Sequence, residues 1–134
     1  MKGLTIDQIK VGDKGVFEKT VTETDVYLYA GITGDLNPAH INARVMADSM
    51  FKGRIAHGML SGGFISTVFG MHLPGPGTIY LSQELKFLAP VKIGDTIKAV
   101  AEVLEVNTEK NRIVCRTYCE NQDGKIVVDG KAVV

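Results

Sequence analysis

Hydrophobic and polar positions follow two different spacings along this chain, and the first half contains mainly helical spacing. Residues 14–21 alternate weakly, as in a strand. Thr22 and Asp25 then have the spacing of a capping box, and apolar positions at helical spacing continue to Thr33. Gly34 can adopt the left-handed conformation that closes a helix, so the pattern predicts that this helix ends there.

Two more helices are predicted before residue 74. A short one is expected over 43–50, with Asn42 as its N-terminal cap and Gly53 closing it. A longer one is expected over 57–73, where apolar residues occur on nearly every side, as in a helix inside a fold. Its glycines each cost about 1 kcal/mol relative to alanine, so we expect a sheet to wrap closely around them. These glycines are Gly58, Gly62, Gly63 and Gly70.

Four strand-like runs with alternating spacing occupy the rest of the chain. They cover residues 79–88, 96–106, 112–120 and 125–134, with turn residues between them. Because no helix separates these strands, we expect an antiparallel meander. A buried helix followed by a long antiparallel sheet indicates an α+β fold in which the sheet curls around the helix. The chain shows no repeat or linker, so we expect residues 1–134 to form one domain.

Charge and cysteine content narrow the classes of partner and location. Fifteen acidic and fifteen basic side chains cancel without a long like-charge run, so we expect no nucleic-acid or membrane-surface partner. The most apolar segment, 59–73, is too short to span a membrane. Cys115 and Cys119 lie about 13 Å apart on one predicted strand, too far for a disulfide. Unpaired thiols and a polar N-terminus favour a cytoplasmic protein.

Candidate chemistry is concentrated in the segment Gly34-Asp35-Leu36-Asn37-Pro38-Ala39-His40. It places a carboxylate and an imidazole five residues apart, and general acid–base catalysis uses these two groups. Pro38 disfavours helix at Asn37, so we expect a defined loop to present Asp35 and His40. The sequence leaves the division into acid and base open. We favour a shared water, with Asp35 as principal base and His40 orienting that water.

A second candidate element begins at His57. If the long helix starts there, the amide of Gly58 lies at its positive end and predicts an oxyanion donor. His57 is more readily explained as a helix cap or as support for its neighbours, and Ser66 as a packing serine bonded to its own helix. Asp35, His40 and His57 lack the short spacings typical of metal sites, so we expect no metal.

Three elements occur in a fixed order along nearly the whole chain. They are the segment 34–40, the segment Arg54-Ile55-Ala56-His57-Gly58-Met59-Leu60, and Leu85-Lys86-Phe87-Leu88-Ala89-Pro90-Val91 followed by Gly94-Asp95. Together they resemble the MaoC-like dehydratases, specifically the (R)-specific enoyl-CoA hydratases. The resemblance implies one hot-dog domain, at least homodimeric, that converts trans-2-enoyl-CoA into (R)-3-hydroxyacyl-CoA or the reverse. It implies an acyl-CoA thioester as substrate and no metal or redox cofactor.

The same resemblance implies roles for individual residues. Asp35 and His40 match the catalytic positions, Gly58 matches the oxyanion-hole position, and Ser66 matches a helix serine near the site. Asn37 and His57 belong to the same motifs, and we expect them to contribute to substrate binding.

Two other functions fit the same fold. An acyl-CoA thioesterase typically has a carboxylate on or near the central helix, whereas no Asp or Glu lies between His57 and Glu84. A non-catalytic acyl-thioester-binding regulator would normally carry an attached domain, for which 134 residues leave no room. The sequence leaves open the acyl chain length, the choice between CoA and an acyl-carrier protein, and the direction of the reaction.

Overall fold

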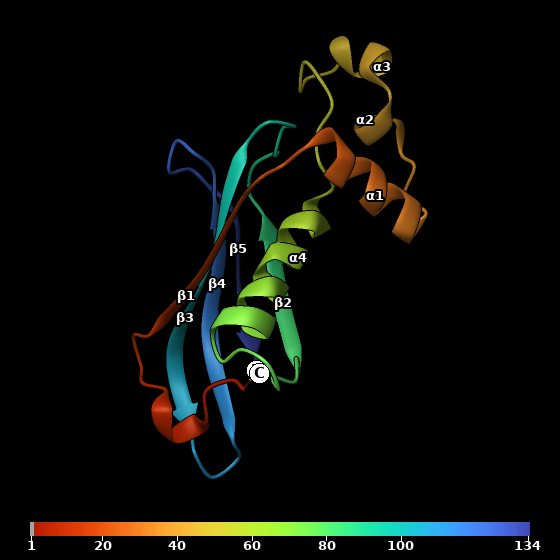
Figure 1. The fold of residues 1–134 in the computed structure, drawn as a ribbon. Helices are drawn as coiled ribbons and strands as arrows, with labels where there is room; N and C mark the ends of the chain where they lie inside the picture. Colours follow the sequence, from red (N-terminus) through yellow and green to blue (C-terminus); the bar gives the residue numbers. More distant parts are fainter. Residues whose placement is uncertain (1) are drawn as a thin grey trace.

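A five-stranded antiparallel sheet wraps around one helix in residues 2–134, which the computed structural model describes (Figure 1). The strand order is β1-β3-β4-β5-β2, so β1 and β2 form the two edges. The strands are β1 (Lys14–Thr20), β2 (Ser82–Phe87), β3 (Thr96–Asn107), β4 (Arg112–Glu120) and β5 (Ile126–Val133). Helix α4 (Gly58–Thr67) lies against the concave face. The predicted α+β arrangement is confirmed, but the predicted meander is wrong for its first strand, because β2 pairs with β5 and not with β3.

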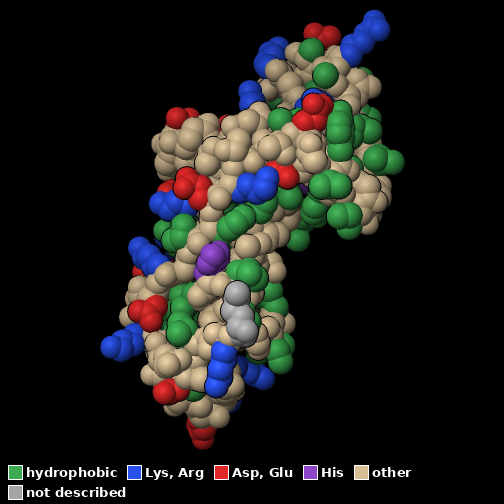
Figure 2. Space-filling view, viewed as in Figure 1, with side chains coloured by type: hydrophobic (Ala, Val, Ile, Leu, Met, Phe, Trp, Pro, Cys, Tyr) green, Lys and Arg blue, Asp and Glu red, His purple; other side chains and the backbone are tan. Residues whose placement is uncertain are grey.

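Three more helices form a projecting segment, residues 22–55, beyond one end of the sheet (Figure 1). They are α1 (Glu23–Thr33), α2 (Pro38–Ile41) and α3 (Ala43–Ala47). Exposed hydrophobic side chains gather on this segment (Figure 2). A single 3-10 turn, η1 (Ile6–Gln8), precedes β1. No helix within residues 2–134 is both long and apolar enough to cross a membrane.

Both ends of α1 follow the sequence pattern. Thr22 Oγ1 accepts a hydrogen bond from the Asp25 amide at 3.1 Å, and Asp25 Oδ2 accepts one from the Thr22 amide at 2.9 Å. Gly34 has a φ of 81° and donates its amide proton to the Ala30 carbonyl. These local interactions end the helix immediately before Asp35.

The predicted loop over residues 35–40 is wrong for its second half. Pro38 is the first residue of α2, and the Asn37 side chain caps that helix by accepting from the Ala39 amide at 2.9 Å. Proline is tolerated at a first helical position because the amide it lacks would have no intrahelical partner there. His40 is therefore held by a helical turn, whereas Asp35 remains on the loop between α1 and α2.

Asn42 caps α3 as predicted, by accepting a hydrogen bond from the Val45 amide, but the helix ends at Ala47 rather than at residue 50. The long helix also ends early: α4 stops at Thr67 and a π-helical turn, η2 (Val68–His72), follows it.

The core lies between α4 and the inner face of the sheet. Burial alternates along β4, which places Cys115, Thr117 and Cys119 inside, and confirms that both cysteines are buried and free. Side chains of α4 and η2 complete the core; those fully or almost fully buried are Phe64, Ile65, Val68 and Phe69.

The sheet approaches only some of the predicted glycines. An added Cβ at Gly58 would lie 2.7 Å from the Phe87 ring, and one at Gly62 would lie 3.1 Å from Leu85. Both partners belong to β2, so close wrapping is confirmed on that side. The expectation is wrong for Gly63 and Gly70, which face open space.

Candidate active site

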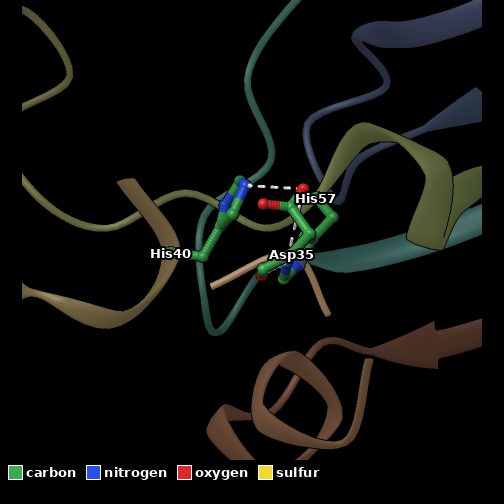
Figure 3. Close-up of side chains that lie close together, drawn as sticks. All are labelled: Asp35, His40 and His57. Atoms are coloured by element: carbon green, nitrogen blue, oxygen red, sulfur yellow. Dashed lines mark hydrogen bonds and ion pairs between the residues drawn. The ribbon is translucent and has the colours of Figure 1, made fainter. Parts of the chain in front are cut away.

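Three side chains from three neighbouring segments converge at the base of the projecting segment (Figure 3). Asp35 lies between α1 and α2, His40 lies on α2, and His57 immediately precedes α4. Asp35 Oδ2 is 3.9 Å from His40 Nε2 and 4.0 Å from His57 Nε2. The structure therefore brings together the predicted pair of Asp35 and His40.

Asp35 presents an open carboxylate on a fixed backbone. Its side chain is 51% exposed, and its Oδ1 accepts a hydrogen bond from the Asn37 amide at 3.2 Å. This short-range bond holds one carboxylate oxygen toward the turn. The other oxygen, Oδ2, faces the two histidines.

His40 has its ring proton assigned by a backbone partner. Nδ1 lies 2.7 Å from the Ile55 carbonyl oxygen, which only accepts, so Nδ1 carries the donated hydrogen. In the neutral imidazole the other nitrogen, Nε2, then has a free lone pair. That atom is the one facing Asp35, in a side chain that is only 11% exposed.

His57 lies under the pair and is 3% exposed. Its Nε2 donates a hydrogen bond to the main-chain carbonyl of Asp35 at 3.0 Å, and its ring stacks on His40 with centroids 3.7 Å apart. Tyr29 packs against the same ring at 4.7 Å. His57 occupies the N-cap position of α4, yet its side chain makes no capping hydrogen bond. The cap role is therefore wrong, and the role of supporting its neighbours is the one this geometry fits.

The three side chains offer ligand atoms within 4.8 Å of one another. The lone pair of an imidazole nitrogen lies in the ring plane, and the two rings are stacked with only 27° between their planes. Their lone pairs therefore lie in two nearly parallel planes, a geometry that is poorly suited to two ligands of one ion. Nε2 of His57 is also occupied by its bond to the Asp35 carbonyl. The arrangement suits hydrogen bonding and proton transfer better than metal coordination.

Gly58 is the first residue of α4, as predicted. An amide at this position has no intrahelical acceptor and lies at the positive end of the helix dipole. A cavity of about 480 Å³ opens beside it, with a mostly apolar lining that includes Phe51, Met59 and Phe87. A backbone donor therefore borders a space suited to an apolar chain.

A second cavity, of about 560 Å³, lies between residues 2–9, residues 74–81 and the C-terminus. Its lining includes Leu4, Ile6 and Ile79 but no Asp, Glu or His. It is larger than the first cavity, but no side-chain carboxylate or imidazole lines it.

The remaining predicted residues have different positions. Asn37 caps α2 and fixes the Asp35 turn, while Ser66 is exposed on α4, two turns beyond Gly58. No hydrogen bond joins Ser66 to the other site residues described. Sequence reasoning missed Ser61, which is buried and lines the cavity. Its spacing of three residues from Gly58 places both on one helix face and was a usable signal.

Comparison with known families agrees with this site. Residues 8–124 match the family described as MaoC like domain. The chain belongs to the MaoC-like domain family. This MaoC-like protein is 50% identical to the (R)-specific enoyl-CoA hydratase of Rhodospirillum rubrum, over 96% of the chain and 88% of that protein. It is 40% identical to the 3-hydroxybutyryl-CoA dehydratase of Methylorubrum extorquens, over 100% of the chain and 85% of that protein.

Solved structures of the same family have the same fold. The R-hydratase of Pseudomonas aeruginosa in its unliganded form superposes with a TM-score of 0.94 and 47% identity, covering 98% of the MaoC-like chain and 84% of that chain. The (R)-hydratase of Aeromonas caviae gives a TM-score of 0.91 and 35% identity, and the match covers 93% of the MaoC-like protein and 95% of the hydratase chain. The expected hot-dog fold is confirmed.

Proposed function

We propose that this protein is a hydro-lyase that hydrates trans-2-enoyl-CoA to (R)-3-hydroxyacyl-CoA and catalyses the reverse dehydration. The observation that carries this proposal is the placement of the Asp35 carboxylate against His40 Nε2, at 3.9 Å. The similarity to proteins named (R)-specific enoyl-CoA hydratase and 3-hydroxybutyryl-CoA dehydratase supports the substrate class and the stereochemistry.

Asp35 and His40 are suited to hold and activate one water. Asp35 Oδ2 and His40 Nε2 can both accept, so a water between them donates one hydrogen to each and turns an oxygen lone pair outward. As that oxygen bonds to C3 of the enoyl group, one of the water's protons passes to Asp35 or His40, which together form the catalytic dyad. A proton from the dyad then bonds to C2. Hydroxyl and hydrogen are added, and both side chains return to their starting state.

Either residue can take the proton from this water. Asp35 offers a carboxylate oxygen, and His40 offers the Nε2 lone pair that its bond to Ile55 leaves free. The preference for Asp35 as principal base therefore stays a prediction.

Gly58 is suited to receive the charge that develops during the addition. Attack at C3 moves electrons toward the thioester oxygen, and an unpaired amide at a helix N-terminus favours negative charge there. The apolar cavity beside Gly58 supports binding of the acyl chain or of the apolar part of the thioester carrier. Addition of water transfers no net electrons, so we propose that the reaction needs no redox cofactor, and that the dyad replaces a metal in activating the water.

We also propose that the protein acts as a homodimer joined along β2. This strand pairs with β5 on one side, and its other side is an open sheet edge in the described chain. Large apolar side chains are exposed in and near it: Met59, Met71, Ile79, Leu81 and Phe87. A second copy paired edge to edge would satisfy the open backbone groups and cover these side chains.

A cytoplasmic location is our proposal from the thiols. Cys115 and Cys119 are free and fully buried, which suits a reducing compartment.

The test is an assay of the purified protein with crotonyl-CoA and longer trans-2-enoyl-CoA thioesters. We expect loss of the enoyl-thioester absorbance and a product of the (R) configuration by chiral chromatography. A thiol reagent added in parallel detects CoA release. Thiol release without hydration would favour the thioesterase, and tight binding by calorimetry without turnover would favour the binding module.

A further inference from the structure

His57 has the position of a helix cap and does not act as one. It directly precedes α4, where a side chain commonly accepts a hydrogen bond from the first turn, but its ring makes no such bond. The ring instead turns toward Asp35, 22 residues earlier in the chain. Only 3% of the residue is exposed, so the ring lies beneath the dyad and not on the surface open to substrate.

The ring contacts both members of the dyad in different ways. Its Nε2–H donates to the Asp35 main-chain carbonyl at 3.0 Å, which fixes the backbone that presents the carboxylate. Its face stacks on the His40 ring at 3.7 Å with 27° between the planes. The bond from His40 to Ile55 restricts rotation within the ring plane, and the stacking restricts tilt out of that plane.

We propose that His57 is a positioning residue that sets the geometry of Asp35 and His40 together, through one hydrogen bond and one ring contact. This inference rests on the proposed hydration. It assigns His57 no contact with substrate and no transfer of a proton. Through these two contacts, one side chain links the placement of the Asp35 oxygen to that of the His40 nitrogen.

The side chain at 57 needs two properties at once. Donation to Asp35 requires an N–H at the Nε2 position, and stacking on His40 requires a flat ring. Histidine combines both, and it does so although Nδ1 is buried without a hydrogen-bond partner in the described structure. An apolar ring would avoid that unpaired nitrogen but would lose the donor. A positioning role explains why a ring with this unpaired, buried Nδ1 lies beside the dyad.

Three substitutions separate the two contacts. His57→Phe keeps a ring and removes the donor; His57→Gln places an N–H near the former Nε2 but removes the ring; His57→Asn places its N–H near the former Nδ1. We expect kcat of His57→Phe to fall about 100-fold, as when reacting groups are displaced by about 1 Å, with little change in KM. His57→Gln should recover part of this loss, and His57→Asn should not. His72→Phe, at an exposed histidine outside the site, should keep wild-type kcat.

Circular dichroism and thermal unfolding establish that each variant is folded. If His57→Phe does not fold, the comparison of Gln with Asn decides. Wild-type kcat in His57→Phe, or equal losses in Gln and Asn, would overturn the proposal. Absence of hydration by the wild-type protein would instead reject the proposed function. Crystal structures of the variants then decide the positioning role: it requires the distance from Asp35 Oδ2 to His40 Nε2 to change in His57→Phe, and an unchanged distance overturns it.

Discussion

Nε2 of His40 and Oδ2 of Asp35 face each other at 3.9 Å, and neither atom has a hydrogen to offer the other while His40 is neutral. The separation exceeds a hydrogen bond, so the two atoms are a pair of acceptors with a gap between them. The ring proton that could close the gap is held at Nδ1 by the Ile55 carbonyl. A small donor such as water completes this arrangement, which is why the pair suits hydration chemistry.

Removing either acceptor should abolish most of the activity. Asp35→Asn replaces a carboxylate oxygen with a group that cannot take a proton, and His40→Ala removes the lone pair. Each should lower kcat by about 10² to 10⁴, the usual contribution of a general acid or base. The measurement is the steady-state rate with crotonyl-CoA. Asp48→Asn, at an exposed site on the projecting segment, is the control and should keep normal activity. Normal rates in both site variants would reject the mechanism.

Glycine at position 58 has a spatial reason, because any residue but proline would supply the same backbone amide but only glycine leaves room for the Phe87 ring. Gly58→Ala keeps the backbone amide but places a methyl group 2.7 Å from the Phe87 ring. We expect a loss of stability of about 1–3 kcal/mol from this overpacking and a fall in kcat as the helix start shifts. The double variant Gly58→Ala with Phe87→Leu relieves the contact and should recover both quantities in part.

Urea unfolding and enoyl-CoA kinetics on the two single variants and the double variant complete this cycle. If the double variant shows merely the sum of the two single effects, space at Phe87 is not the reason for glycine at position 58.

Arg54 should support the site without touching it. Its guanidinium donates to Glu23 at 2.7 Å and to the Tyr27 hydroxyl at 3.0 Å, which ties the segment before Ile55 to α1. Because the Ile55 carbonyl orients His40, Arg54→Met should loosen that orientation and lower kcat roughly tenfold, within the 0.5–2 kcal/mol typical of such networks. Arg44→Met, at an exposed site on α3, is the matched control. Equal rates in the two variants would contradict this role.

The same ion pair has a defined response to pH. The hydrogen bond from Arg54 lowers the pKa of Glu23 below its ordinary value, with smaller contributions from the Tyr27 hydroxyl and the Arg54 charge. A lowered pKa means that the pair stabilises the fold at neutral pH and loses this effect as pH falls through the lowered pKa. The difference in unfolding temperature between wild type and Arg54→Met should therefore shrink in acid.

The sequence predicted those parts of the site that depend on neighbouring residues. The Thr22–Asp25 box and Gly34 determine where α1 ends, and hence that Asp35 is presented at a helix terminus. The start of the long helix near His57 was predicted from the apolar spacing alone, and α4 begins at Gly58. Pro38 misled the prediction because proline has two opposite effects on helices. It disfavours helical backbone at the residue before it, here Asn37, but it is itself favourable as the first residue of a helix, here α2.

The parts that depend on tertiary contacts could not be predicted. The tautomer of His40 is determined by a main-chain carbonyl 15 residues away, and a backbone oxygen leaves no mark in the side-chain pattern. The ring of His57 turns away from its own helix because Asp35 and His40 lie beside it in the folded chain. The alternation of strands predicted the sheet, but which helix glycines face β2 depended on the position of that strand.

Disrupting the open edge of β2 should separate the proposed dimer. Leu81 is 48% exposed immediately before β2, so Leu81→Lys adds a charge that a paired edge would have to bury. We expect the mass measured by light scattering to fall toward that of one chain. Leu104→Lys, at a residue of β3 that is 43% exposed, is the control and should leave the mass unchanged. A wild-type protein with the mass of one chain at micromolar concentration would reject the dimer.

The buried thiols should make the fold less stable at alkaline pH. Burial raises the pKa of Cys115 and of Cys119 to about 12, from an ordinary value near 9. Between these two values the unfolded chain releases thiol protons that the folded chain keeps, so the folded state binds more protons and stability falls as pH rises. Full burial of both side chains means that solvent screens this effect little. By pH 10 the loss should approach about 1.4 kcal/mol for each thiol.

Urea unfolding of wild type between pH 8 and 10 measures this slope, at one protein concentration because assembly also affects stability. The control is the variant Cys115→Ala/Cys119→Ala, which keeps the other groups that titrate in this range. Its starting stability is lower than that of wild type, but it should lose less stability between pH 8 and 10. A thiol reagent at pH 8 provides a second measurement: it should react with the two cysteines only after unfolding, because the folded thiols are protonated and enclosed. Parallel slopes in the two proteins, or rapid reaction of the folded protein, would show that the thiols are not held protonated by burial.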